Sequence, residues 1–129
     1  MCLGTQASPV SYAIGIVNYR TYTDLGRCLE TVKIQSQAPV ATFVLDVNPD
    51  PRKHEDMRAQ NPHVHWTEVP NRGFAAGANE IISQVAKTYP DVKFVLILNP
   101  DIELESCYAE NLLVEMSRQA DTAIASGKL

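Results

Sequence analysis

Short apolar runs rich in β-branched residues recur along the chain, and turn-forming residues follow each of them. Runs of this length that end at proline, asparagine or glycine are typical of buried strands. The pattern predicts four strands, at Tyr12–Val17, Ala41–Leu45, Val64–Val69 and Phe94–Leu98. Thr122–Ala125 has the composition of the start of one more strand.

The segments between these runs carry apolar residues at helical spacing, which predicts amphipathic helices. One helix is expected after Thr23, one from the segment 71–77 to about Thr88, and one after Ser106, which can cap it. Their predicted apolar faces are Leu25, Cys28, Leu29 and Val32; then Ala78, Ile81, Ile82, Val85 and Tyr89; then Leu112, Leu113 and Met116. Arg52–Gln60 is polar and is expected to be a short surface helix. Strands that alternate with helices indicate an α/β, Rossmann-like parallel sheet with helices on both faces.

Composition and charge narrow the possible functions. The chain has 129 residues and a net charge of −4, with 45% hydrophobic and 20% charged residues, which suits one globular domain from residue 10 to 129 after a flexible tail at 1–9. The acidic balance disfavours nucleic acid as a partner.

No apolar stretch approaches the about 20 residues that span a bilayer, and the N-terminus lacks the features of a secretory signal. Three widely spaced cysteines are not a disulfide framework, and we expect a cytoplasmic protein, with the inner face of the membrane as one place of action.

Polar residues follow each of the four predicted strands. They are Asn18 and Tyr19, Asp46, the segment Asn71-Arg72-Gly73, and the segment Asn99-Pro100-Asp101. Ligands of open α/β sheets bind at the carboxyl ends of the strands, so this set predicts a binding site at one edge of the sheet. The alternative is that these are ordinary turn residues, since asparagine, glycine and proline are common in any loop.

The residue types at this edge favour a cation bound together with phosphate. Asp101 follows an apolar strand and a proline, and one such carboxylate can hold Mg²⁺ or Mn²⁺ if water and substrate phosphates complete the shell. The glycine patterns of dinucleotide-binding loops and P-loops are absent from the sequence. His63 and His65 share a strand face but lack further ligands for zinc, and His54 is expected at the surface.

Together these segments resemble the family 2 glycosyltransferases, especially their rhamnosyltransferase-like branch. The resemblance is carried by Ile16-Val17-Asn18-Tyr19, by Leu45-Asp46, by Asn71-Arg72-Gly73-Phe74-Ala75-Ala76-Gly77-Ala78-Asn79, and by Leu96-Ile97-Leu98-Asn99-Pro100-Asp101. It implies the A-type glycosyltransferase fold and inverting transfer of a sugar, rhamnose being one candidate, from a UDP- or dTDP-linked donor to a glycan or lipid-linked acceptor.

The resemblance also implies roles for individual residues. Asn18 and Tyr19 would border the base, Asp46 would meet the base or ribose, and Asn71 and Arg72 would lie near the base or diphosphate. Gly77, Asn79 and Asn99 would be further substrate-binding residues, and Asp101 would bind the metal.

The sequence departs from the family pattern in ways that keep alternatives open. Asn99 stands where many relatives have the first aspartate of Asp-x-Asp, and Val47 and Asn48 follow Asp46 where relatives usually have Asp-Asn. The segment 123–129 resembles the opening of the acceptor-binding half, so the general base is expected beyond Leu129. The sheet edge on which that half would pack is a candidate surface for a homodimer. The alternatives are a non-catalytic nucleotide-binding remnant and a phospho-acceptor receiver module, although the latter needs an acidic pair where this chain has Asn18 and Tyr19.

Overall fold

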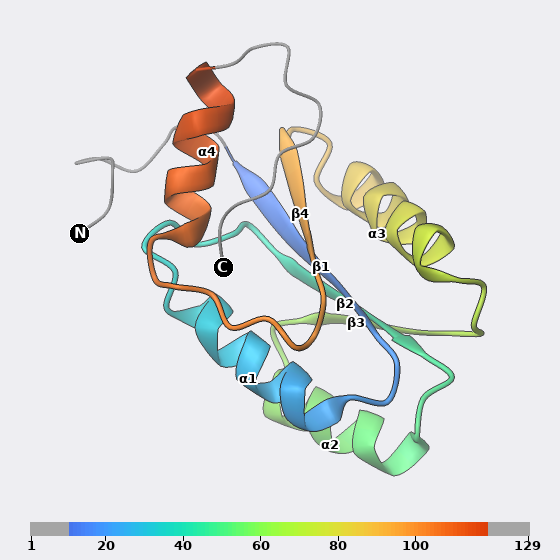
Figure 1. Cartoon of the computed structure of the whole chain (residues 1–129). Coiled ribbons are helices and arrows are strands. Elements are labelled where there is room, and N and C mark those ends of the chain that lie inside the picture. The colour runs from blue at the N-terminus through green and yellow to red at the C-terminus, as the bar shows by residue number, and fades with distance from the viewer. Residues whose placement is uncertain (1–10, 119–129) are drawn as a thin grey trace.

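The computed structural model describes residues 11–118, except for the side chains of residues 117 and 118. The predicted tail at 1–9 and the predicted strand at 122–125 lie outside this range. Within it, strands and helices alternate (Figure 1). The elements are β1 (Tyr12–Asn18), α1 (Tyr22–Lys33), β2 (Thr42–Val47), α2 (Pro51–Gln60), β3 (His65–Val69), α3 (Phe74–Thr88), β4 (Phe94–Leu98) and α4 (Tyr108–Arg118).

The four strands form one parallel sheet in the order β3-β2-β1-β4. Asn18 at the end of β1 is in register with Asp46 of β2, and Val47 of β2 is in register with Val69 of β3. The carboxyl ends of the strands therefore lie at the same edge of the sheet, as predicted. The strand order reverses between β1 and β4, which makes the space beyond these two ends the topological switch point of the sheet.

Helices cover both faces of the sheet, which confirms the predicted Rossmann-like α/β class (Figure 1). Residues of α1, α2 and α4 pack on one face, where Leu25, Cys28 and Leu29 are almost fully buried. Residues of α3 pack on the other face through Ile81 and Val85. We call these the α1 face and the α3 face.

Several boundaries and burial predictions differ from the structure. The first helix begins at Tyr22, before the predicted Thr23, and the last begins at Tyr108, two residues after Ser106. Ile82 was predicted to face the core but is 47% exposed. The predicted surface helix is α2, which Asp50 caps by accepting hydrogen bonds from the backbone N–H groups of Arg52 and Lys53, both at 3.1 Å.

The expectation that His54 lies at the surface is wrong. His54 belongs to α2, and its side chain is buried on the side of the helix that faces the sheet. The side chain of Met57, three residues later, is buried on the same side. These two residues are the inward face of a helix whose other positions are mostly exposed.

None of the helices described between residues 11 and 118 has the length and apolar character that crossing a membrane requires.

Candidate functional site

The switch point carries exposed polar and aromatic residues from both flanking loops. Tyr19, directly after β1, is 53% exposed. Asn99 and Asp101, directly after β4, are exposed as well. Pro100 and Asp101 occupy the two central positions of a turn in which the carbonyl of Asn99 accepts a hydrogen bond from the N–H of Ile102 at 3.2 Å. This turn fixes Asp101 at the edge of the sheet, because proline restricts the backbone at its second position.

The Asp101 carboxylate fits a cation that one protein ligand shares with phosphate and water. Within residues 11–118 it has no hydrogen-bond or ion-pair partner, and no group of three or more histidine, cysteine, aspartate or glutamate residues could hold a metal ion. A site made only of protein ligands, as zinc requires, therefore does not exist in this part of the chain. Mg²⁺ and Mn²⁺ accept a single carboxylate when a nucleotide supplies further oxygens.

Asp101 also acts electrostatically on the α1 face. Burial raises the pKa of the Cys28 thiol to about 12, and the negative charge of Asp101 acts in the same direction. Cys28 belongs to the buried face of α1, as the sequence predicted.

Asn18 and Asp46 lie beside each other at the ends of β1 and β2, and both side chains are 0% exposed. Asn18 Nδ2 donates to Asp46 Oδ1 at 3.1 Å, and Asn18 Oδ1 accepts a hydrogen bond from the hydroxyl of Thr21 at 2.7 Å. Asn18, predicted to border the base, and Asp46, predicted to meet the base or ribose, therefore contact each other. Their contact with a ligand stays a prediction.

Two helices complete the surroundings of the Asp46 carboxylate. The Tyr22 hydroxyl of α1 lies 2.9 Å from Asp46 Oδ2, and His54 Nδ1 of α2 lies 2.8 Å from the same oxygen. With its proton on Nδ1, His54 donates to this oxygen, and its Nε2 lies 3.9 Å from Glu68 Oε1. Burial raises the pKa of Tyr22 to about 12, and the hydrogen bond to Asp46 and its charge act in the same direction. The hydroxyl consequently stays protonated and can donate to the carboxylate over the whole physiological pH range.

The loop after β3 carries the predicted residues Asn71 and Arg72, both exposed. Asn71 Oδ1 accepts a hydrogen bond from the N–H of Gly73 at 3.1 Å, and Gly73 is the N-cap of α3 with a φ of 90°. Glycine is suited to this position because a side chain strongly disfavours such a φ. The Arg72 side chain has no hydrogen-bond or ion-pair partner among the described residues.

A hollow of about 270 Å³ opens on the α3 face beside this loop. Arg72 and Gly77 line it together with Val47 and Val69 from the ends of β2 and β3. Gly77 itself is buried, and a Cβ at this position would lie 3.1 Å from Val17 Cγ1, so its absent side chain permits close packing of α3 on β1. Asn79, two residues further along α3, is exposed.

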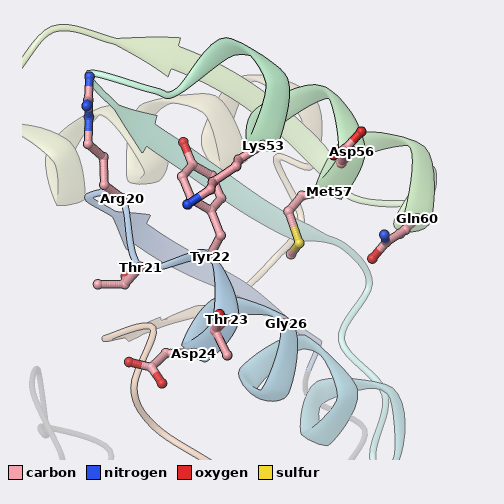
Figure 2. Close-up of a pocket in the computed structure, with 10 residues that line it drawn as sticks. All are labelled: Arg20, Thr21, Tyr22, Thr23, Asp24, Gly26, Lys53, Asp56, Met57 and Gln60. Atoms are coloured by element: carbon pink, nitrogen blue, oxygen red, sulfur yellow. The ribbon is translucent and has the colours of Figure 1, made fainter.

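A second, more open hollow of about 500 Å³ lies between α1 and α2 (Figure 2). Arg20 and Lys53 bring positive charge to it, and Asp24 and Asp56 bring negative charge. Sequence reasoning assigned none of these residues to a site. The signal available for Arg20 was its place directly after Asn18 and Tyr19 at the end of a strand.

The predicted site residues thus fall into three groups. Asn18 and Asp46 are buried on the α1 face; Tyr19, Asn99 and Asp101 flank the switch point; and Asn71, Arg72, Gly77 and Asn79 lie along the loop and first turns of α3.

Comparisons with known proteins support the fold. No family model matches the chain, and no curated protein matches it. Among solved structures, a 4-diphosphocytidyl-2C-methyl-D-erythritol synthase is similar with a TM-score of 0.63 and 15% identity over 91% of this chain and 57% of that one. A mannosyltransferase from Pyrobaculum calidifontis, in complex with GDP-Man and Mn²⁺, is similar with a TM-score of 0.64 and 15% identity over 87% of this chain and 35% of that one.

These similarities concern the Rossmann-like fold alone, which the chain shares with the synthase and with the mannosyltransferase. The chain spans about 57% of the length of the first structure and about 35% of the second. Identity of 15% carries no residue roles across, so function has to be argued from the site.

Proposed function

We propose that this chain is the donor-binding part of a family 2-like glycosyltransferase. It binds a nucleoside-diphosphate sugar together with Mg²⁺ or Mn²⁺ at the switch point between β1 and β4. The observation that carries the proposal is the exposed Asp101 carboxylate, which has no partner among the described residues and is fixed by a turn at that point. The mannosyltransferase that shares this fold was solved with GDP-Man and Mn²⁺, which supports a donor and cation of this kind.

Side chains from two groups at the carboxyl edge of the sheet, the switch point and the loop before α3, divide the work of binding such a donor. The exposed ring of Tyr19 offers a flat surface on which a base can stack, a contact worth about 1–3 kcal/mol. Arg72 offers a guanidinium with no partner in the described part of the chain to an oxygen of the diphosphate or the base. Asn99 offers a neutral amide next to the cation ligand Asp101.

The chemistry of transfer requires that charge developing on the leaving diphosphate be stabilised. A bound divalent cation supplies this stabilisation in metal-dependent transferases. Asp101 would hold that cation, and Arg72 would add positive charge at the same edge of the sheet. We assign the general base of an inverting reaction to no residue between 11 and 118. The sugar is here proposed to be a hexose or deoxyhexose such as rhamnose, and it would pass to a glycan or lipid-linked acceptor.

The structure gives reasons against the receiver alternative. A phospho-acceptor aspartate must present a free oxygen to the phosphodonor, whereas Asp46 is 0% exposed and both of its oxygens accept hydrogen bonds. The position after β1 also carries Asn18 and Tyr19 in place of an acidic pair. These observations favour a nucleotide-sugar site over a phosphorylation site.

Calorimetric titration with UDP, dTDP and their sugars tests the proposal, each with Mn²⁺ and with a chelator. We expect Mn²⁺ to tighten binding about tenfold or more, which corresponds to about 1.4 kcal/mol. Asp101→Asn should lose this increment because it removes the charge that holds the cation. Glu103→Gln is the matched control, since Glu103 is exposed two residues away and should leave the increment unchanged.

The three parts of the proposal fail separately. Absence of binding to every nucleotide overturns the donor site. Equal affinity with Mn²⁺ and with chelator overturns the role of the cation, and an unchanged increment in Asp101→Asn overturns the role of that residue.

A further inference from the structure

Asn48 is the residue that connects the loops after β1, β2 and β3. It follows Val47 at the end of β2, its side chain is exposed, and its φ is 44°. Asparagine tolerates this left-handed conformation better than most residues with a side chain. Here the conformation is stabilised by hydrogen bonds to two neighbouring loops.

Three groups of Asn48 make these hydrogen bonds. Its N–H donates to the carbonyl of Val69 at the end of β3, at 2.9 Å. Its side-chain Oδ1 accepts from the N–H of Asn71 at 3.2 Å, and its carbonyl accepts from Nε of Arg20 at 2.7 Å. One residue of the β2 loop thus contacts the loops on either side of it.

The contacts continue into both neighbouring loops. Asn71 Oδ1 accepts from the N–H of Gly73, so the position of Asn71 influences where α3 begins. Arg20 also has a positive φ, 55°, and its bond to the Asn48 carbonyl holds the segment that directly follows Tyr19. Conformations of this kind persist in non-glycine residues when surrounding contacts fix them.

We propose that Asn48 is a positioning residue for donor binding, which fixes the loops that carry Tyr19, Asn71 and Arg72 in the arrangement that receives the nucleotide. This inference rests on the proposed function. The physical reason is that exposed loops lose conformational freedom when a ligand binds, and loops that are already fixed lose less. Asn48 has no direct contact with the donor in this proposal.

Two substitutions at this position separate the side-chain contact from the backbone conformation. Asn48→Gly keeps the left-handed conformation accessible and removes the acceptor for the Asn71 N–H. Asn48→Asp keeps an oxygen acceptor in the same place. The added charge of this second variant is screened by working at about 0.5 M salt, where the screening length is roughly 4–5 Å.

The experiment measures the affinity for UDP and dTDP with Mn²⁺ by calorimetry, the exchange of the Asn71 amide proton with water by NMR, and the melting temperature. We expect Asn48→Gly to accelerate Asn71 exchange and to weaken nucleotide binding about five- to tenfold, because the hydrogen bond that orders the loop before the donor binds is lost. Asn48→Asp should retain slow exchange and bind more tightly than Asn48→Gly. A merely structural role would lower the melting temperature and leave the affinity unchanged.

The possible failures are distinguishable. If the wild type binds and Asn48→Gly binds equally well, the inference is overturned while the proposed function stands. Unchanged Asn71 exchange in Asn48→Gly, or equal loss of affinity in both variants, also overturns the inference. If the wild type binds no nucleotide, the proposed function is overturned, and this role of Asn48 with it.

Discussion

The carboxylate of Asp46 accepts hydrogen bonds from residues of three different elements, β1, α1 and α2. Buried carboxylates are costly unless every oxygen is satisfied, and here Asn18, Tyr22 and His54 satisfy them. The backbone N–H of Asp50 in turn donates to the Tyr22 hydroxyl at 3.0 Å, which joins the start of α2 to the same cluster. Asp46 therefore links two helices of the α1 face, α1 and α2, to the carboxyl end of the sheet.

Because of the Tyr22 phenol, the free energy of unfolding should depend on pH in the alkaline range. Tyr22→Phe should lower the free energy of unfolding by about 1–3 kcal/mol at pH 8, because a buried carboxylate loses a hydrogen bond. The ordinary pKa of tyrosine is 10.0, and burial raises the pKa of Tyr22 to about 12. Above pH 10 the unfolded chain releases this proton first, so the wild type loses the advantage of its phenol progressively from pH 10 to 12.

Urea unfolding at a series of pH values measures this effect. The difference in stability between the wild type and Tyr22→Phe should be constant up to pH 9 and shrink above pH 10. Tyr19→Phe is the control, since that ring is 53% exposed and has no hydrogen-bond partner among the described residues. A difference that stays constant to pH 12 would contradict the assignment.

At the scale of elements, the sequence predicted the type and order of every described strand and helix. The reason is that buried parallel strands are continuous apolar runs, and the helices between them have clear apolar faces. What the sequence did not predict was the burial of one face of α2, which consists of His54 and Met57. A histidine counts as polar in any periodic pattern, so the burial of this face depended on a partner in β2 that the pattern of α2 does not reveal.

For the candidate site, too, the sequence pattern did not reveal which side chains are buried or which contacts they make. Position after a strand predicted correctly that Asn18, Asp46, Asn71 and Asp101 lie toward one edge of the sheet. It did not reveal which face each side chain occupies, because β2 is buried on both faces and has no alternation to read. The connecting role of Asn48 was equally hidden, since it depends on backbone hydrogen bonds to neighbouring loops.

Two glycines allow a matched test of how closely α3 packs on the sheet. A Cβ at Gly15 of β1 would lie 2.5 Å from Ile81 Cγ2 and 3.0 Å from Ile97 Cδ1. We expect Gly15→Ala to lower the free energy of unfolding by about 1–3 kcal/mol, because the core must shift to admit a methyl group. Gly26 of α1 has only Met57 Cε near its Cβ position, at 3.9 Å.

Gly26→Ala is therefore the control. It should raise the free energy of unfolding by about 0.5–1 kcal/mol, the usual gain from replacing a glycine inside a helix. Chemical denaturation of both variants measures the two effects. Equal shifts of the same sign would show that the short distances at Gly15 do not limit packing.

At the scale of the whole molecule, β1 and β2 form the centre of the fold. Each pairs with a strand on both sides, and helices cover both faces of these two strands. β3 and β4 each pair with one strand among those described. The free energy of local opening should therefore be larger for β1 and β2 than for β3 and β4. Opening a central strand breaks its pairing with two strands and disrupts the packing on both faces of the sheet.

Native-state hydrogen exchange measured by NMR tests this expectation. The amides of β1 and β2 should exchange only by global unfolding, with the largest free energies of opening in the chain. Amides in the second half of β3, where Glu68 is exposed, should open with smaller free energies. Exchange in β3 as slow as in β1 would contradict this order.

The pairing of β1 with β4 has a consequence for the order of folding. Tyr12 lies opposite Phe94, so the ladder that creates the switch point joins the first described strand to the last. Contacts between such distant segments form late, because a long loop has to close before they can be made. During synthesis, β1, β2 and β3 leave the ribosome before β4, so the edge of the sheet beside Tyr19 is complete only after β4 has followed them.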